Sequence, residues 1–472
     1  MHVSPLTIPS FRRLFAAQVI ALVGTGLSTI ALTLLAFDLV GGNAASVLGT
    51  ALAFKMVAYV VFAPIVGGLA HRFARKRFLV AMDLVRAATV LLFPLATQVW
   101  QIYLLIFLLN LFSAGFKPVF TATIPDIVTD ERQYTRALSM SRLAYDLENL
   151  LSPLVAGLAL LFVTYSGLFA ANAVAFVLSA LLILMTRLPL SAPSDRLGTL
   201  RQQINFGLLA YLKTPRLRGL LALYVSVSSA SAMVIVNTVV YVRETLGRTE
   251  SDVAIALGAA GTGSMLVALL LPRLLDKRPD RPVMLGGTIL MAAGLAWMGT
   301  GPDLLALLMA WFLVGAGWSA VQTPAGRLVN RSASPGDRPA YFSAQFALSH
   351  ACWLVLYSVA GQLGTRIGIE TTALVLSATV VVFAVVAAAL WPARDDEPLP
   401  HVHDELDHDH DHDHVHDEHH DHEHEGWEGD EPHRHPHRHG RVKHSHVFVI
   451  DDHHQAWPRF RVADQRHAHS HD

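Results

Sequence analysis

The feature that most constrains the fold of this chain is a series of long apolar stretches before residue 393. A bilayer core about 30 Å thick is crossed by about 20 mainly apolar residues in a helix. Only 15% of the residues are charged and the mean hydropathy is +0.41, which is far too apolar for an ordinary soluble protein. The sequence therefore predicts an all-α membrane protein of twelve transmembrane helices. They should start near Phe11, Ala44, Phe78, Trp100, Thr135, Gly167, Leu217, Asp252, Val283, Leu304, Ala340 and Thr371.

The distribution of lysine and arginine predicts the orientation of these helices. Arg12 and Arg13 precede the first apolar stretch, which is too long for a signal-peptide core and lacks a convincing cleavage site, so we interpret it as a retained helix. If the amino terminus is cytoplasmic, the inner segments hold 21 basic residues, against Arg243, Arg248 and Arg366 on the outer side. With an even number of helices, both termini then lie in the cytosol.

Similarity between two parts of the apolar region predicts an internal repeat. GGLAHRFARKRFLV aligns with PRLLDKRPDRPVML, SAGF with GAGW, and PLVAG with YSVAG, all at offsets of 202 to 205 residues. We therefore expect a six-helix half at residues 1–190, a cytoplasmic linker at 191–216, a second six-helix half at 217–393 and a tail at 394–472.

The repeat and the segment GGLAHRFARKR resemble the major facilitator superfamily of transporters, over residues 1–393. In that family two six-helix halves alternate access to a central site, and a signature G-x-L-a-D-r-x-G-r-k-x joins helices 2 and 3. Here His71 stands where the family usually has an aspartate that helps latch the cytoplasmic side, and Ala74 where it has glycine. The gating residues that the resemblance implies are Gly67, Leu69, His71, Arg72, Arg75 and Lys76, with Asp276 as the acid of the second copy.

The tail carries the second constraint, because 22 of its residues from 401 to 472 are histidines. Neutral imidazoles interleaved with aspartate and glutamate suit Ni(II), Co(II), Zn(II) and Cu(II). The single cysteine, Cys352, excludes a thiolate cluster within one chain. The predicted ligands are His401, His403, His408, His410, His412, His414, His416, His419, His420, His422, His424, His433, His435, His437 and His439.

The spacing of these histidines permits two backbone states. In an extended chain His408, His410, His412, His414 and His416 fall on one side. In a helix the histidines at every fourth residue form a stripe, which consists of His408, His412, His416, His420 and His424. We expect a largely disordered tail without metal, with at most a hairpin between Val447 and Val462. The alternative is a solvated low-complexity tail with no role.

The architecture and the histidine-rich tail together resemble the bacterial nickel-resistance exporters of the same superfamily. That resemblance implies nickel, with cobalt second, as the cargo, and the bacterial inner membrane as the location. We expect protons as the coupling ion. We expect a monomer with no permanently bound cofactor and no nucleic acid partner.

Four polar residues near the middle of two predicted helices are candidates for the transport path, because ionisable groups at that depth are costly unless they function. Asp146 can instead form a structural i, i+4 ion pair with Arg142. Glu148 lacks such a local partner and is the preferred site for a cation or proton. His350 is either a ligand or a hydrogen-bonded packing residue. The repeat offset of 204 residues makes its position in the second half equivalent to that of Asp146 in the first half. The four candidates are Asp146, Glu148, Asn149 and His350.

Other polar residues in the predicted helices leave their roles open. Lys55 can pair with Glu148 or Asp83, or extend toward the membrane surface. Asp83 and Arg86 should form a structural pair, and Asp38 should lie at a cavity mouth. The side chains expected to line the path, or to let helices pack closely, are Asn110, Ser113, Thr121 and Asn237, while Cys352 should be core.

The sequence contains no phosphate-binding loop and no motif of an enzyme, so transport should be driven by an ion gradient. The preferred function is proton-coupled export of nickel or cobalt, with a tail that captures cytosolic metal. The alternative is export of an organic compound, such as a drug or siderophore, with a tail that senses or buffers metal. A membrane-anchored metal store would leave the twelve-helix repeat unexplained.

Overall fold

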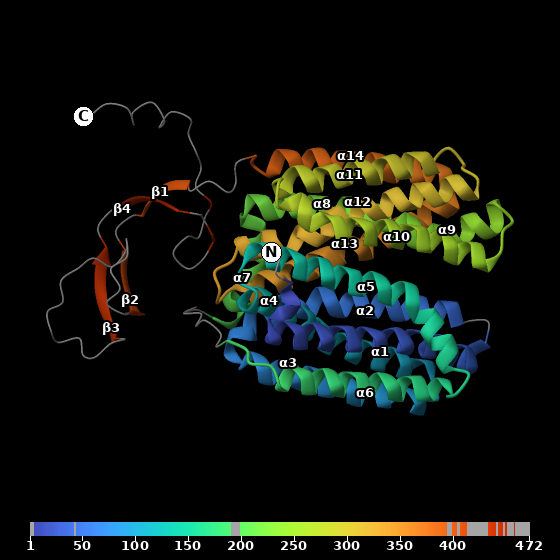
Figure 1. Cartoon of the computed structure of the whole chain (residues 1–472), viewed down its shortest axis with the longest axis horizontal. Coiled ribbons are helices and arrows are strands. Elements are labelled where there is room, and N and C mark those ends of the chain that lie inside the picture. The colour runs from blue at the N-terminus through green and yellow to red at the C-terminus, as the bar shows by residue number, and fades with distance from the viewer. Residues whose placement is uncertain are drawn as a thin grey trace.

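In the residues that the structure describes, twelve long helices run side by side in one bundle, as the computed structural model shows (Figure 1). The structure describes residues 4–41, 44–189, 199–393, 399–403, 406–412, 433–439, 442–446, 449–450 and 457. Each long helix starts within four residues of its predicted position. The first six are α1 (Pro9–Val40), α2 (Ala44–Leu69), α3 (Arg75–Leu91), α4 (Val99–Ile127), α5 (Glu131–Ala159) and α6 (Tyr165–Leu184).

The second six helices follow α7 (Leu200–Lys213), which lies in the predicted linker range. The first of them is α8 (Pro215–Ala232), which continues through π-helical turns at Met233–Asn237 and Tyr241–Thr245 with α9 (Thr238–Val240) between them. The others are α10 (Glu250–Leu275), α11 (Asp280–Met298), α12 (Leu304–Arg331), α13 (Arg338–Ile367) and α14 (Ile369–Leu390). Short 3₁₀ turns lie at Pro5–Thr7, Ala70–Arg72 and Phe93–Leu95.

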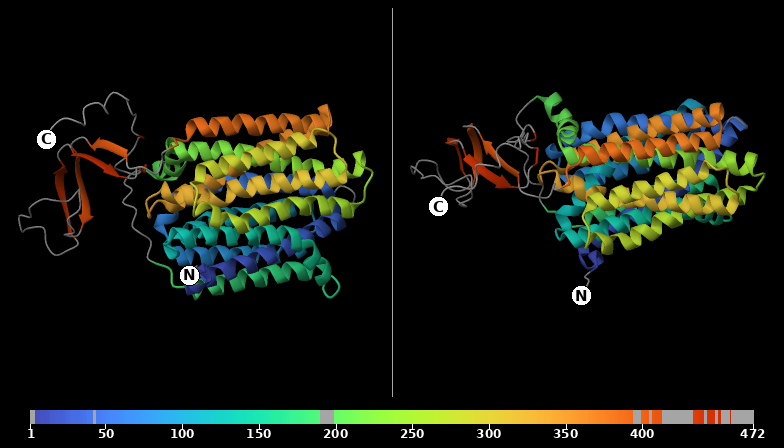
Figure 2. Two further views of the ribbon diagram at one scale, coloured as in Figure 1. Left: turned by 45° about the horizontal axis from the view of Figure 1, so that its top comes forward. Right: turned by 90° about the horizontal axis from the view of Figure 1, so that it is seen from above.

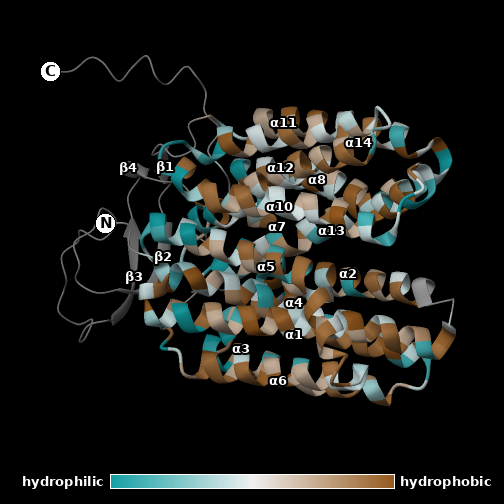
Figure 3. Cartoon of the chain, turned by 45° about the vertical axis from the view of Figure 1, so that its right-hand side comes forward, coloured by the Kyte–Doolittle hydropathy of each residue, from teal (hydrophilic) through white to brown (hydrophobic). Residues whose placement is uncertain are grey.

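Within the described residues, eleven helices are long and apolar enough to cross a membrane. The twelfth, α5, carries Arg142, Asp146 and Glu148 and lies beside the others, against α1 and α10. Hydrophobic residues cover the middle of the bundle and hydrophilic residues gather at its two ends (Figure 3). The predicted all-α membrane fold is therefore confirmed, as a multi-pass membrane protein.

The helices pack as two halves. The first half is α1 to α6, with α1 against α6 and α2 against α4, and the second is α8 to α14, with α12 against α10 and α11. The halves meet where α2 packs on α13 and α5 packs on α10 (Figure 2). We call the end at which α1 begins and α14 finishes the tail end, and the opposite end the far end.

The described strands of the tail lie beyond the tail end (Figure 1). Strand β1 (Leu399–His403) pairs antiparallel with β4 (Val442–His446), and β2 (Leu406–His412) pairs antiparallel with β3 (His433–His439). The segment 406–412 thus takes the extended state, not the helical one. The predicted ligands that lie outside the described residues are His414, His416, His419, His420, His422 and His424.

Two described residues of the tail, Ile450 and Trp457, contact the bundle. Ile450 is 2% exposed in the second-half core, and its carbonyl accepts a hydrogen bond from Tyr341 of α13 at 2.7 Å. Trp457 packs on the same core, with Arg216 of α8 5.7 Å from its ring centre. Most of the hairpin expected between Val447 and Val462 lies outside the described residues. The histidine tract is therefore attached to the second half on both sides.

Candidate functional site

Two charge triads join the halves at the tail end. In the first triad, Asp126 of α4 accepts hydrogen bonds from Arg75, at the start of α3, and from Arg338, at the start of α13. Arg75 and Asp126 belong to the first half and Arg338 to the second, so the carboxylate ties one half to the other. The three side chains are between 7% and 17% exposed. Because water is largely excluded, their attraction is stronger than that of a surface ion pair.

The second triad has the same layout with inverted charges. Asp280, at the start of α11, pairs with Arg331 of α12, and Arg331 lies 3.9 Å from Glu131 at the start of α5. Arg327 contacts both acids, at 2.7 Å from Glu131 and 3.5 Å from Asp280. Positions 75 and 280, and positions 126 and 331, are each related by an offset of 205 residues. Each half thus holds an ion pair that a charge of the other half completes.

The predicted gating loop contributes to this closure at three places. Arg75 belongs to the first triad, and Gly67 of α2 packs so closely on Ser343 of α13 that a Cβ at position 67 would overlap that side chain. Arg72 donates to Gln203 of α7 at 2.7 Å. Contact between the halves therefore forms without the aspartate that His71 replaces.

The remaining gating candidates lie at the edge of the closure. Asp276, after α10, is 3.8 Å from Arg132 of the first half, and Arg132 is 73% exposed. Such a pair contributes little, because solvent screens it. Leu69, His71 and Lys76 are partly buried on the same loop.

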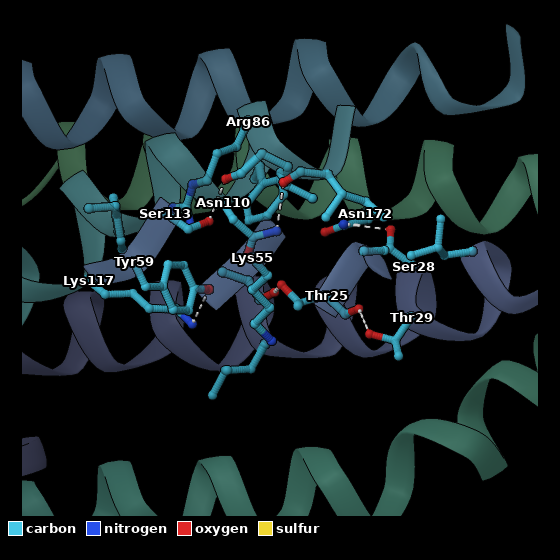
Figure 4. Close-up of a pocket in the computed structure, with 18 of the residues that line it drawn as sticks. Thr25, Ser28, Thr29, Lys55, Tyr59, Arg86, Asn110, Ser113, Lys117 and Asn172 are labelled. Carbon is cyan, nitrogen blue, oxygen red and sulfur yellow. Dashed lines mark hydrogen bonds between the residues drawn. The ribbon is translucent and has the colours of Figure 1, made fainter. Parts of the chain in front are cut away.

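The first half contains a cavity of about 380 Å³, which we call the first-half cavity (Figure 4). It extends from mid-bundle toward the far end, where Thr29 and Thr33 of α1 and Leu48 of α2 line it. Among the described residues, its lining includes no aspartate or glutamate. Its polar and basic lining residues are Gln18, Thr25, Ser28, Thr29, Thr33, Lys55, Tyr59, Arg86, Asn110, Ser113, Lys117, Thr121, Tyr145 and Asn172.

Two lysines give the first-half cavity its charge. Lys117 of α4 donates to the hydroxyl of Tyr59 at 3.2 Å, and the Nζ of Lys55 lies 5.8 Å from the centre of the Tyr59 ring (Figure 4). Neither lysine forms an ion pair within the described residues, so neither acid predicted for Lys55, Glu148 or Asp83, pairs with it. Glu148 is the acid whose field acts on both lysines.

Arg86 is the third basic residue of the first-half cavity, and its charge is compensated. It pairs with the fully buried Asp83, which also accepts from Ser179 of α6 at 2.8 Å. The guanidinium lies 4.0 Å from the ring centre of Phe116 and 4.5 Å from that of Phe176. The predicted structural pair is confirmed, and it also forms part of the cavity wall.

Several lining residues were not predicted. Thr25, Thr29 and Thr33 follow one another at four-residue steps on α1, and each hydroxyl donates to the carbonyl four residues before it. This spacing is visible in the sequence and could have indicated a polar face on an otherwise apolar helix. Lys117 was also missed, although a lysine inside an apolar stretch is the same signal as Lys55. By contrast, Asn110, Ser113 and Thr121 line the cavity as expected.

A second cavity of about 250 Å³ lies between the halves, and it contains His350. His350 is surrounded by the rings of Tyr59, Phe346 and Trp353, at 4.8, 4.1 and 5.0 Å between ring centres. Its Nδ1 lies 2.7 Å from the carbonyl of Phe346. The two cavities share Gln18, Phe120, Thr121 and Tyr145, so they adjoin.

The four predicted transport residues occupy separate places. Asp146 pairs with Arg142 at 2.8 Å and accepts from Ser264 of α10 at 2.6 Å, which supports the structural alternative. Glu148 is half-buried beside Gly26 of α1, where a Cβ would meet its Oε1 at 3.1 Å. Asn149 is exposed and donates to the carbonyl of Tyr145.

No group of three or more histidine, cysteine or acidic residues that could hold a metal exists in the part of the chain that the structure describes.

Three other residues singled out in the sequence also lie in the described part of the structure. Asn237 is 4% exposed and donates to the carbonyl of Ala360 at 3.3 Å, so it packs and does not line either cavity. Asp38 is exposed near the far end, and Cys352 is half-buried.

The triads predict an effect of Asp126→Asn on the closure. Removing the carboxylate leaves Arg75 and Arg338 facing each other without an acid, and breaking a buried pair costs about 3–5 kcal/mol. The tail end should open more often. With Ser343→Cys in a Cys352→Ala background, maleimide labelling of position 343 should accelerate at least about tenfold, since 1.4 kcal/mol is a factor of ten. Asp38→Asn, an exposed acid at the far end, is the control and should leave the labelling rate unchanged. An equal rate in Asp126→Asn would show that the triads do not hold the halves together.

Two sequence relatives of this chain are an efflux protein and a transporter. Macrolide efflux protein A of Streptococcus pyogenes is 25% identical over 184 residues, which are 38% of this chain and 45% of that protein. The chain therefore aligns with less than half the length of that relative. The uncharacterised MFS-type transporter YfiS of Bacillus subtilis is 25% identical over 395 residues, 79% of this chain and 91% of that protein.

The solved structures agree in fold. A bacterial homologue of the iron transporter ferroportin, in an outward-facing state, has a TM-score of 0.68 at 14% identity and covers 80% of this chain and 98% of its own. The sequence model of the Major Facilitator Superfamily matches residues 14–281 and 220–410. This match spans most of the chain, so the chain belongs to the Major Facilitator Superfamily.

Proposed function

We propose that the chain is a secondary-active exporter of a divalent transition metal, nickel first and cobalt second, whose tail collects the metal in the cytosol. The tail end then faces the cytosol of a bacterial cell and the bundle spans the inner membrane. In this orientation the observed state is closed to the cytosol, and the first-half cavity extends toward the outside.

The observation that carries this proposal is the register of β2 and β3. The antiparallel ladder places His408 opposite His437, His410 opposite His435 and His412 opposite His433. Residues opposite each other in such a ladder have Cβ atoms about 4.5–5.5 Å apart, and alternate residues share a face. The register therefore puts three histidine pairs at alternate positions along the β2–β3 ribbon. The described residues do not form a finished site of three ligands, so the proposal is that a bound metal draws imidazoles of these pairs together.

The residues between these pairs support the same ladder. Asp407 lies opposite Arg438 and Asp411 opposite Arg434, so opposite charges alternate with the histidine pairs along the ribbon. Cross-strand pairs of opposite charge stabilise a sheet by roughly 0.2–1 kcal/mol each. The segments that supply the histidine pairs are therefore also suited to pair with each other.

Proton coupling belongs to this proposal. Glu148 is half-buried, forms no ion pair in the described part of the chain, and lies close enough to Lys55 and Lys117 for its charge to act on them. Protonation of a carboxylate in that position changes the charge of the whole region. We therefore assign the returning protons to Glu148, while His350 acts on cargo in the second cavity.

A second candidate function is export of an organic compound, with a tail that senses or buffers metal. The first-half cavity favours it, because its volume of about 380 Å³ and its mixture of aromatic, aliphatic and polar side chains suit a small organic molecule. The similarity to macrolide efflux proteins supports this candidate too.

Cellular nickel separates the two candidates. Cells that express the full chain should retain less nickel and tolerate more of it than cells with an empty vector. A chain that stops after Ala393 should keep part of this effect, because the two halves form a complete carrier without the tail. Nickel content is measured by mass spectrometry at equal protein level. Unchanged or higher nickel content, together with lower retention of an organic efflux substrate, would favour the second candidate.

The register predicts which histidines matter most in the tail. Replacing His408, His410 and His412 by alanine removes one member of every β2–β3 pair. This variant of the full chain should bind at least one nickel ion fewer and more weakly than a variant with His467, His469 and His471 replaced, although both lose three imidazoles. Calorimetry at pH 7.5 measures the difference.

Binding should fall as the pH drops through about 6.5, because protonated imidazole cannot ligate a metal. Equal losses in the two triple variants would show that the tail acts as an unstructured array without paired sites.

A further inference from the structure

We infer that the first-half cavity binds an organic anion, a molecule with a carboxylate or similar group on an apolar, partly aromatic body. The inference concerns the core of the bundle and does not involve the tail. It rests on the proposed export function in one respect, because the bound anion is taken to be cargo.

The charges around the first-half cavity carry the inference. Lys55 and Lys117 lie on either side of Tyr59 and form no ion pair in the described residues, while the charge of Arg86 is compensated by Asp83. No acid of the described chain lines the cavity. Glu148 acts on both lysines from outside the cavity but forms no ion pair with either of them in the described residues. A lysine without a contacting acid at membrane depth is costly, and an anion bound beside the two lysines would offset that cost.

The remaining side chains that line the first-half cavity indicate what the rest of the bound ligand is like. The rings of Tyr59, Phe116 and Phe176 form apolar surfaces around the basic groups, and further phenylalanines extend the wall. Asn110 lines the cavity and Asn172 donates to Ser28 at 2.6 Å, so amide groups are within reach of polar parts of a ligand (Figure 4). A volume of about 380 Å³ accommodates one or two aromatic rings.

The same lining is unfavourable for a bare divalent cation. A metal ion takes carboxylate, carbonyl, water or neutral imidazole ligands, and protonated lysine is none of these. His350 lies in the adjoining cavity among aromatic rings, and Asp146 is already paired with Arg142. A metal bound by organic acids, however, can carry negative charge and an apolar body. The shared chemistry is thus an organic carboxylate, either free or coordinated to nickel.

Binding to the purified full chain in detergent tests the inference. The probe is 2-naphthoate, and its cationic counterpart is 2-naphthyl-trimethylammonium, which has the same rings and opposite charge. Binding is followed by the rise in the thermal unfolding temperature over a range of concentrations, because a ligand that binds the folded state stabilises it. The variants are Lys55→Gln, Lys117→Gln and their combination. Lys277→Gln, an exposed lysine after α10, is the matched control, and Lys117→Arg restores the charge.

We expect 2-naphthoate to stabilise the wild type and the cationic naphthyl compound to have at least tenfold lower affinity. The double variant should lose at least tenfold in 2-naphthoate affinity, whereas Lys277→Gln and Lys117→Arg should bind like the wild type. Equal affinity for the two probes, or full affinity in the double variant, would overturn the inference. If the glutamine variants do not fold, the contrast between the two probes on the wild type still decides it.

Two further measurements distinguish a free organic acid from a nickel complex, and this inference from the proposed nickel export. Displacement of 2-naphthoate by the anionic nickel dipicolinate complex, but not by nickel chloride, would indicate a metal complex as cargo, and displacement by dipicolinate alone at equal concentration would indicate the free acid. Nickel export by cells without anion binding by the protein would refute this inference and leave the proposed function intact. Anion binding by the protein without nickel export by the cells would support this inference and refute the proposed nickel export.

Discussion

The ion pairs that join the two halves at the tail end determine what the rest of the bundle can do. Asp126 is held by arginines of both halves, and Arg331 contacts acids of both halves, so each triad crosses the interface. In a partly dehydrated site such charges are costly apart and favourable together. While they remain together the tail end stays closed, and the first-half cavity extends from mid-bundle toward the far end. Any movement of cargo requires that both triads separate.

Much of the fold could be predicted from the sequence, because a membrane requires about 20 apolar residues in each helix and eleven of the described helices have that pattern. Local ion pairs could also be predicted, because residues three or four apart are neighbours on a helix surface. Asp83 pairs with Arg86, and Arg142 pairs with Asp146, at these spacings. The contacts of Asp126 were not predictable, because its partner Arg338 is 212 residues away and meets it only when the halves close. The repeat offset aligned His350 with Asp146, but equivalent positions in two halves need not be neighbours in space.

The core and the tail present two different chemistries. The tail concentrates imidazole and carboxylate groups, which bind transition metals, in strands whose register pairs the histidines. The first-half cavity presents Lys55 and Lys117, which attract anions and repel bare cations. A nickel ion that is first bound by the tail and then coordinated by organic acids, as an anionic complex, would match both the tail and the first-half cavity. The contacts of Ile450 and Trp457 with the second half keep the histidine tract near the closed end, where such a transfer would begin.

The central claim is that the bundle is a carrier whose tail end must open in every cycle. A reducible bifunctional methanethiosulfonate reagent can link Arg132→Cys to Asp276→Cys, in a Cys352→Ala background, because these two side chains lie 3.8 Å apart across the interface at the tail end. Proteoliposomes that contain this variant should show no proton-driven nickel movement when the cysteines are cross-linked, and should recover it when a reductant is added. Undiminished transport in the cross-linked protein would contradict the account, because cargo would then cross the membrane without separation of the halves.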